Sequence, residues 1–173
     1  MEHQSAIAYG NEYKTGYKGF DYSRIGLDFD YIIIHETGHE WWGNVVSVAD
    51  IADLWIHEGF CTYSEAVYVE CMYDREKSLE YINAKKPTIK NEAPMLGIPG
   101  VNHEGSGDMY SKGMLVLNTL RTLVEDDELW FNAIHGLVQE FSFKPTDTDD
   151  VVNYLSDTLN KDLTAFFEQY LAY

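Results

Sequence analysis

The sequence predicts a mainly helical domain of the α+β class, with its β structure confined to a small N-terminal part. The chain changes in character near residue 28. Before that point it is rich in Gly and Tyr with short β-friendly runs, a composition typical of a strand or ribbon followed by turns. After that point apolar residues recur at helical spacing. We therefore expect residues 1–27 to form a β and turn segment and residues 28–173 to form a helical core.

The length of the chain sets the expected number of domains. Its 173 residues, of which 45% are hydrophobic and 14% aromatic, can bury one core and are too few for two ordinary domains. The sequence contains no internal repeat and no low-complexity tract. We expect one soluble globular domain over residues 1–173.

Helix-start signals place the first helices. A cap at Asp28 or Asp30 predicts a helix that runs to about Asn44. A cap at Asp53 predicts the next helix, through the segment LWIHEGFCTYSEAVYVECMYD. A short helix is expected over residues 75–85.

A long connection separates these helices from the last ones. The segment KPTIKNEAPMLGIPGVNHEGSGD, residues 86–108, is punctuated by Pro and Gly. Irregular connections of this length are unusual in compact domains unless they carry function. Four further helices are expected to begin near Asp108, Asp126, Thr148 and Asp162.

Charge and hydropathy exclude two classes of partner. The chain has 12 basic and 29 acidic residues and a formal net charge of -17, whereas nucleic-acid binding requires a basic stripe. Apolar runs stay far below the roughly 18 residues that a spanning helix needs, so no membrane insertion is expected. The compartment stays open between cytoplasmic and exported. Cys61 and Cys71 are too few for a disulfide framework and are expected to be thiols.

The stretch YIIIHETGHEWWGN carries the strongest chemical signal. His35 and His39 are four residues apart, so on a helix they lie one turn from each other on one face and can bind one metal ion together. Glu36 projects about 100° around the helix, near enough to reach a water at that metal. This H-E-x-x-H arrangement predicts a metal site with Glu36 as a general base.

A third ligand is expected from the following helix. Eighteen residues, 40 to 57, separate His39 from Glu58, which is enough for one helix to end and the next to return beside it. Two imidazoles, one carboxylate and an open position are the donor set of a catalytic zinc site, so one zinc ion per chain is expected. His57, next to Glu58, is the alternative ligand.

These residues resemble the aminopeptidase N family of gluzincin zinc metallopeptidases. The likeness lies in H-E-x-x-H followed after eighteen residues by Glu within W-x-x-E-G-F, and GHEWWGNVVS extends it. Met1 and Glu2 resemble the end of the family's G-x-M-E-N motif, MYSKGMLVL resembles its catalytic-tyrosine segment, and residues 143–171 are similar to its closing helices. The resemblance implies the helical portion of a thermolysin-like catalytic domain with a small N-terminal β remnant.

The resemblance also implies a role for each matched residue. His35, His39 and Glu58 would bind zinc, Glu36 would activate the water, Tyr110 would stabilise the oxyanion, and Glu2 would bind the substrate's free α-amine. Two further positions are less determined. His3 stands where the family usually has Asn. Glu65, seven residues after Glu58 on the same helix face, is either an acceptor for a ligand imidazole or a surface charge.

The implied activity is that of a zinc aminopeptidase, a hydrolase that releases N-terminal residues from peptides with a free N-terminus. A thermolysin-like endopeptidase and a non-catalytic interaction module of the same fold are the alternatives. The family's catalytic domain is normally flanked by an N-terminal β domain and a helical C-terminal domain, and neither is recognisable here. We therefore expect a catalytic-domain fragment that works with the other domains of a longer protein and has little activity alone.

Overall fold

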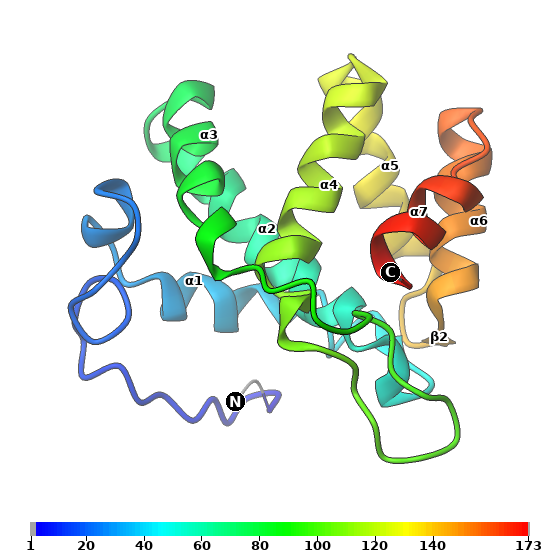
Figure 1. Cartoon of the computed structure of the whole chain (residues 1–173), viewed down its shortest axis with the longest axis horizontal. Coiled ribbons are helices and arrows are strands. Elements are labelled where there is room, and N and C mark those ends of the chain that lie inside the picture. Colours follow the sequence, from blue (N-terminus) through cyan, green and yellow to red (C-terminus); the bar gives the residue numbers. More distant parts are fainter. Residues whose placement is uncertain (1–2, 173) are drawn as a thin grey trace.

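The computed structural model describes residues 3–172, and most of them lie in helices (Figure 1). The mainly helical class predicted from the sequence is confirmed. The α-helices are α1 (Tyr31–Gly38), α2 (Trp55–Met72), α3 (Arg75–Ala84), α4 (Ser111–Val124), α5 (Asp127–Glu140), α6 (Thr148–Leu159) and α7 (Thr164–Leu171). Short 3-10 helices are η1 (Ile25–Leu27), η2 (Ile51–Asp53), η3 (Lys86–Thr88) and η4 (Gly107–Met109). The strands are β1 (Ser47–Val48) and β2 (Pro145–Thr146).

The β structure is small, as predicted, but it lies elsewhere in the chain. Within the described residues, the only named strands are β1 and β2, which pair in parallel. The N-terminal segment instead forms turns, with one isolated bridge between Tyr17 and Phe20 and the 3-10 helix η1. Its backbone takes positive φ at Glu12, Tyr13 and Lys18. These left-handed residues bend the chain too often for a ribbon to extend.

The first helix is shorter than the sequence predicted. Asp30 caps α1 by accepting a hydrogen bond from the backbone N–H of Ile32, as expected, but the helix ends at Gly38 rather than near Asn44. A turn follows, in which Gly43 has a φ of +133° and its N–H donates to the carbonyl of Val46. This tight reversal brings the chain back toward α2.

The start of α2 also differs from the prediction. Asp50, not Asp53, acts as a cap, because it accepts from the N–H of Ala52 and starts η2, which leads into α2. The carboxylate of Asp53 instead accepts hydrogen bonds from the N–H and hydroxyl of Thr148, at 3.2 and 2.6 Å. Thr148 is the first residue of α6, and Asp147 is its cap. Asp53 therefore joins the starts of two helices distant in sequence.

The other predicted starts give a mixed result. Asp126 caps α5, and Asp162 accepts a hydrogen bond from the first residue of α7. Asp108 does not cap α4. Its carboxylate accepts from the backbone N–H groups of Lys90 and Asn91, at 2.9 and 2.7 Å. It thereby ties the long connection, which is irregular after η3 as predicted, to the start of α4.

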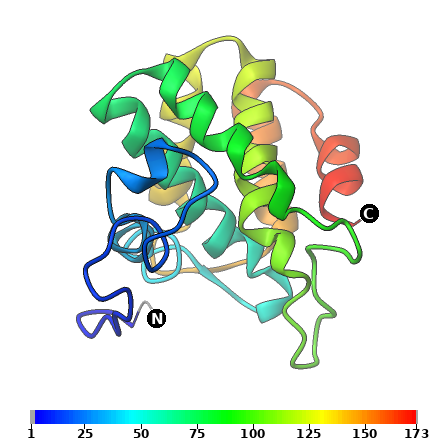
Figure 2. The ribbon, with the colours of Figure 1, turned by 60° about the vertical axis from the view of Figure 1, so that its left-hand side comes forward.

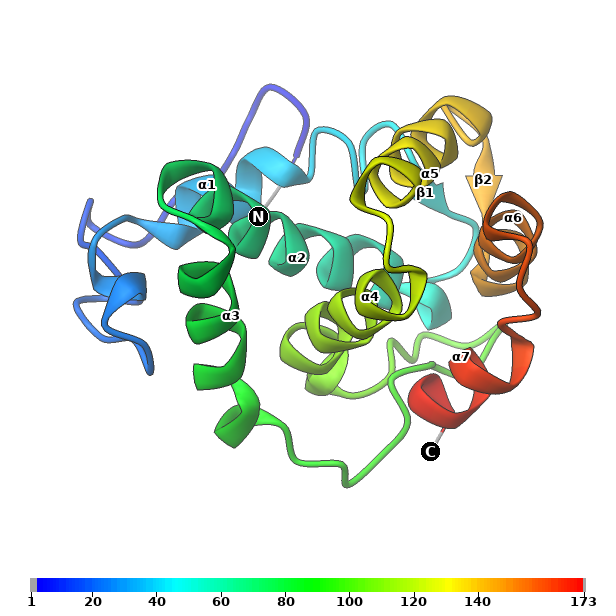
Figure 3. The same cartoon turned by 90° about the horizontal axis from the view of Figure 1, so that it is seen from above.

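Helix α2 is the centre of the domain. It contacts α1, α3 and α4, and the views in Figures 1 and 3 show it running between them. The N-terminal segment lies on the same side of the molecule as α1 and α3, away from α6 and α7 (Figure 2). The largest fully buried side chains are Trp55, Trp130, Tyr81, Phe60, Phe167, Ile56, Ile82, Met95, Met114, Leu117, Leu120 and Leu137.

The sequence also led to expectations about the two cysteines and about membrane-spanning helices. Cys61 is buried and Cys71 is exposed, and neither forms a disulfide. Between residues 3 and 172, no helix has both the length and the apolar character required to cross a bilayer.

Candidate metal centre

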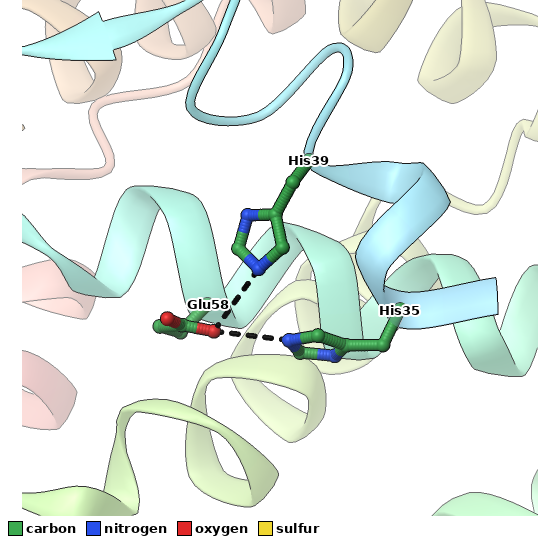
Figure 4. Close-up of side chains that lie close together, drawn as sticks. All are labelled: His35, His39 and Glu58. Atoms are coloured by element: carbon green, nitrogen blue, oxygen red, sulfur yellow. Dashed lines mark hydrogen bonds and ion pairs between the residues drawn. The ribbon is translucent and has the colours of Figure 1, made fainter. Parts of the chain in front are cut away.

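Helices α1 and α2 bring the three predicted ligands together. His35 lies in the last turn of α1, His39 is the residue at its C-terminal cap, and Glu58 lies in the first turn of α2. One donor atom from each residue lies within 4.8 Å of the other two. Figure 4 shows both rings pointing at the carboxylate. All three side chains are buried in the described structure.

The close approach of α1 to α2 depends on Gly38. A Cβ at this position would lie 3.3 Å from the sulfur of Cys61 and 3.5 Å from its Cα. The first distance is tighter than ordinary van der Waals contact, so a side chain at this position would require the sulfur of Cys61 to shift by a few tenths of an ångström. A glycine between the two histidines therefore lets α1 approach α2 without that shift.

The spacing of the donor atoms fits a zinc ion. The Nε2 atom of His35 lies 3.0 Å from Oε2 of Glu58, and the Nε2 atom of His39 lies 3.6 Å from the same oxygen. Ligands at zinc distances of about 2.0–2.1 Å in a tetrahedral arrangement are roughly 3.4 Å apart. Two imidazole nitrogens and one carboxylate oxygen are also the donors that a three-ligand zinc site uses.

The outer nitrogens of both histidines are held by acceptors. Nδ1 of His35 donates to Oε1 of Glu65 at 2.8 Å, and Nδ1 of His39 donates to the carbonyl oxygen of Trp42 at 2.9 Å. Because each Nδ1 serves as a donor, the lone pair of each Nε2 is available to a metal. Glu65 is 2% exposed. Of the two possibilities left open by the sequence, its position fits an imidazole partner and not a surface charge.

The pKa values in the cluster are shifted because the carboxylates of Glu58 and Glu65 flank the imidazole of His35. Burial disfavours the charged form of His35, but the hydrogen bonds to Glu58 and Glu65 outweigh burial and raise the pKa of His35 to about 10. Burial likewise opposes ionisation of Glu58, yet the hydrogen bonds from His35 and His39 lower the pKa of Glu58 to about 2. The two carboxylates therefore favour a positive charge between them, and a divalent ion would compete with a proton for Nε2 of His35.

The alternative ligand, His57, lies outside the cluster. Its Nε2 atom accepts a hydrogen bond from the backbone N–H of Val48 at 3.1 Å. Although it is adjacent to Glu58 in sequence, its ring supports β1, because neighbouring residues on a helix point about 100° apart.

Glu36 and Tyr110 line the same cavity as the ligands. The cavity has a volume of about 670 Å³. Glu36 is half-buried at its wall. The ring of Tyr110, 41% exposed, stacks beside the ring of His35 with a centroid distance of 5.9 Å and an interplanar angle of 30°. The carboxylate of Glu36 and the side chain of Tyr110 thus line the same space as the cluster of His35, His39 and Glu58.

The remaining predicted residue, Glu2, lies outside the described residues. Its neighbour His3 is described and exposed. The proposed recognition of the substrate amine by Glu2 therefore stays a prediction.

Sequence reasoning missed two partners of the ligands. The first is the carbonyl of Trp42, a backbone group to which no side-chain motif points. The second is Tyr81 of α3, whose hydroxyl donates to Oε2 of Glu65 at 2.5 Å. The sequence contains 13 tyrosines, and no spacing rule separates this one from the rest, since it lies on a different helix from every ligand.

Comparison with known proteins places the chain among peptidases. Residues 23–170 match the Peptidase family M1 domain. Among curated proteins, endoplasmic reticulum aminopeptidase 1 of Rattus norvegicus is 29% identical over 160 residues, which cover 87% of this chain and 16% of that protein. Aminopeptidase N of Lactococcus lactis subsp. lactis is 25% identical over 153 residues, covering 81% of this chain and 18% of that protein. The chain thus spans less than a fifth of the length of these relatives.

Solved structures share the fold. A mutant M1 zinc metallopeptidase of Deinococcus radiodurans, bound to a Tyr-Ser-Ala substrate, superposes with a TM-score of 0.71 at 21% sequence identity. The match covers 84% of this chain and 33% of that one. At this level of identity the likeness concerns the fold alone.

Proposed function

The chain belongs to peptidase family M1, and from this premise we propose that it is the catalytic core of a zinc aminopeptidase. The single observation that best supports the proposal is the buried cluster of His35, His39 and Glu58, which shares one cavity with Glu36 and Tyr110. A ligand cluster alone would suit a structural metal. A general base and a hydroxyl donor beside it are what hydrolysis requires.

The first task of the chain is to hold the ion. His35 and His39 would bind through Nε2, with each ring oriented by its Nδ1 hydrogen bond, and Glu58 would bind through a carboxylate oxygen. Three protein ligands leave a position open for water or substrate. When bound in such a site, zinc polarises a carbonyl group and lowers the pKa of water to about 7.

The second task is to move a proton. Glu36 would accept a proton from the attacking water and later deliver it to the leaving amine, so that its carboxylate returns to its starting state. Tyr110 would donate a hydrogen bond to the carbonyl oxygen as that oxygen gains negative charge. Both residues line the cavity, in which we expect the substrate to bind.

The third task is to select peptides by their amino terminus. A free α-amine is cationic at neutral pH and needs a carboxylate partner in a partly desolvated pocket. Glu2 is the proposed partner, by the likeness of Met1 and Glu2 to the family's exopeptidase motif. The tripeptide in the Deinococcus radiodurans structure is consistent with peptides as substrates. Other domains of a longer protein would complete the pocket.

Two measurements test the proposal. Metal analysis of the purified chain should find one zinc per chain. The full-length enzyme should hydrolyse amino-acid amides and free peptides while N-acetylated peptides react poorly, because acetylation removes the charged amine. Equal rates on free and acetylated peptides would support an endopeptidase instead. Zinc binding without any hydrolysis by the full-length protein would support an interaction module.

A further inference from the structure

A buried tyrosine outside the ligand helices is connected to the metal centre. The ring of Tyr81, in α3, is fully buried, and its hydroxyl donates to Oε2 of Glu65 in α2 at 2.5 Å. The other oxygen of the same carboxylate, Oε1, accepts from Nδ1 of His35 in α1 at 2.8 Å. The three side chains thus form a continuous path of hydrogen bonds across three helices and end at a proposed zinc ligand.

The carboxylate of Glu65 has little alternative to these two donors. Its side chain is 3% exposed, so water contributes little to its solvation. A buried carboxylate is costly unless its oxygens are hydrogen-bonded. Each oxygen of Glu65 has one of these donors, and the orientation of the group is set by both bonds together.

The position of Tyr81 is itself fixed by its surroundings. The ammonium group of Lys85 lies 4.6 Å from the centroid of its ring, and the ring of Phe29 packs at a centroid distance of 5.9 Å. Burial raises the pKa of Tyr81, and the nearby charge of Glu65 raises it further. The hydroxyl is therefore held in place as a proton donor.

We propose that Tyr81 is a positioning residue of the metal centre: by holding one oxygen of Glu65, it keeps the other aligned on His35. This inference rests on the proposed zinc site. The role is indirect, because no atom of Tyr81 would touch metal or substrate. Loss of the hydroxyl would leave Oε2 of Glu65 buried without that donor, so only the bond to His35 would orient the carboxylate and its alignment on the imidazole would become less well defined.

The substitution Tyr81→Phe removes only the hydroxyl and keeps the ring. The matched control is Tyr63→Phe in α2. Tyr63 is also buried, and its hydroxyl accepts a hydrogen bond from Nε1 of Trp130 at 3.0 Å, in a contact with α5 rather than with the metal ligands. Both variants remove a buried, hydrogen-bonded tyrosine hydroxyl, and Tyr63 also interacts with Arg121, so Tyr63→Phe controls for a general loss of stability.

The measurement is the zinc dissociation constant of the chain, obtained by competition with a chromophoric chelator. Loss of an outer partner of a ligand typically weakens metal binding by 10- to 100-fold. Because Tyr81 acts one residue further out, we expect Tyr81→Phe to weaken binding by about 10-fold, and Tyr63→Phe by less than about twofold. The absorption spectrum of the cobalt-substituted chain should change only in Tyr81→Phe, since it reports ligand geometry.

A double-mutant cycle tests whether Tyr81 acts through Glu65. In a chain that carries Glu65→Leu, the further change Tyr81→Phe should leave zinc affinity within about twofold, because no carboxylate remains to be held. An equal loss in both backgrounds would overturn the proposal, as would normal zinc affinity of Tyr81→Phe or an equal loss in Tyr63→Phe. If the unaltered chain bound no zinc, the metal site itself would be wrong, and the positioning role with it.

Discussion

Gly113 of α4 lies so close to Gly59 of α2 that a Cβ at position 113 would be 2.8 Å from the Cα of Gly59. This is the point where the two central helices cross. Glu58, a proposed ligand, precedes Gly59, and Tyr110 lies one turn before Gly113 at the start of α4. The glycine contact therefore sets the distance between the ligand cluster and the tyrosine beside it.

The substitution Gly113→Ala should separate these helices. The added methyl group meets backbone rather than a movable side chain, so we expect a loss of about 1–3 kcal/mol in the free energy of unfolding. Urea denaturation measures this loss. Gly107→Ala is the control, because nothing lies within 4 Å of the position its Cβ would take. Equal stability of the two variants would show that the contact between α2 and α4 can accommodate a methyl group at position 113.

Replacement of Glu58 should release the metal. Glu58→Gln keeps the shape of the side chain but removes the charge that favours a divalent ion, so zinc should be lost on dialysis against a chelator. Metal analysis after dialysis provides the readout. Glu76→Gln, an exposed change in α3, should retain one equivalent. Full retention by Glu58→Gln would exclude Glu58 as a ligand.

Replacement of Glu36 should separate binding from chemistry. Glu36→Gln in the full-length enzyme should retain zinc and lose nearly all turnover, since an amide cannot accept the proton of the attacking water. Zinc content and kcat are measured on the same preparation. A rate close to that of the unaltered enzyme would remove Glu36 from the mechanism.

Replacement of Tyr110 should affect the transition state. Tyr110→Phe should lower kcat by roughly 100- to 1000-fold with little change in KM, as is typical when an oxyanion donor is lost. The ring that stacks beside His35 is retained, so zinc content should not change. A large rise in KM at constant kcat would instead assign Tyr110 to substrate binding.

Acid should weaken the contact between α2 and the start of α5. Arg121 is hydrogen-bonded through two nitrogens each to Glu70 and Asp127, at 2.7 to 2.8 Å. These hydrogen bonds lower the pKa values of both carboxyl groups. The stabilisation is therefore present above their unfolded pKa values, near 4, and is lost as the pH falls through the lower folded values.

The substitution Glu70→Gln tests this pH dependence. At neutral pH the variant should be less stable than the unaltered chain by about 1–2 kcal/mol, because a charge-assisted hydrogen bond is replaced by a neutral one. The difference should shrink as the pH falls below about 4. Urea denaturation at several pH values gives both quantities. A difference that is constant with pH would mean that packing, not charge, is responsible.

The gathering of His35, His39 and Glu58 into one cluster was predictable because its signal is local. His35 and His39 belong to one helical turn, and the spacing to Glu58 allows one helix to return beside another. The hydrogen-bond partners of these residues were harder to predict from the sequence. Glu65 could be guessed from its helix face, but its burial depends on α3, and Tyr81 reaches it only in the folded structure.

The same limit applies to the fold. The helical segments were predictable from periodicity, whereas the roles of individual aspartates were not. Asp53 and Asp108 stand where caps are expected, yet each accepts hydrogen bonds from a segment distant in sequence. A carboxylate accepts from any nearby donor, so tertiary contacts decide between local capping and a long-range tie.

The proposed ligands are closer together in sequence than the residues that join α2 to α6. This difference in sequence separation favours an order of folding. His35 and Glu58 are separated by 23 positions, whereas the hydrogen bond from Trp55 to Thr148 joins residues 93 positions apart. Short loops close faster and at lower entropic cost than long ones. During synthesis, α1 and α2 therefore leave the ribosome first, and they can pair before the residues of α6 have been synthesised. The later helices then dock onto a helix pair that already carries the three proposed metal ligands.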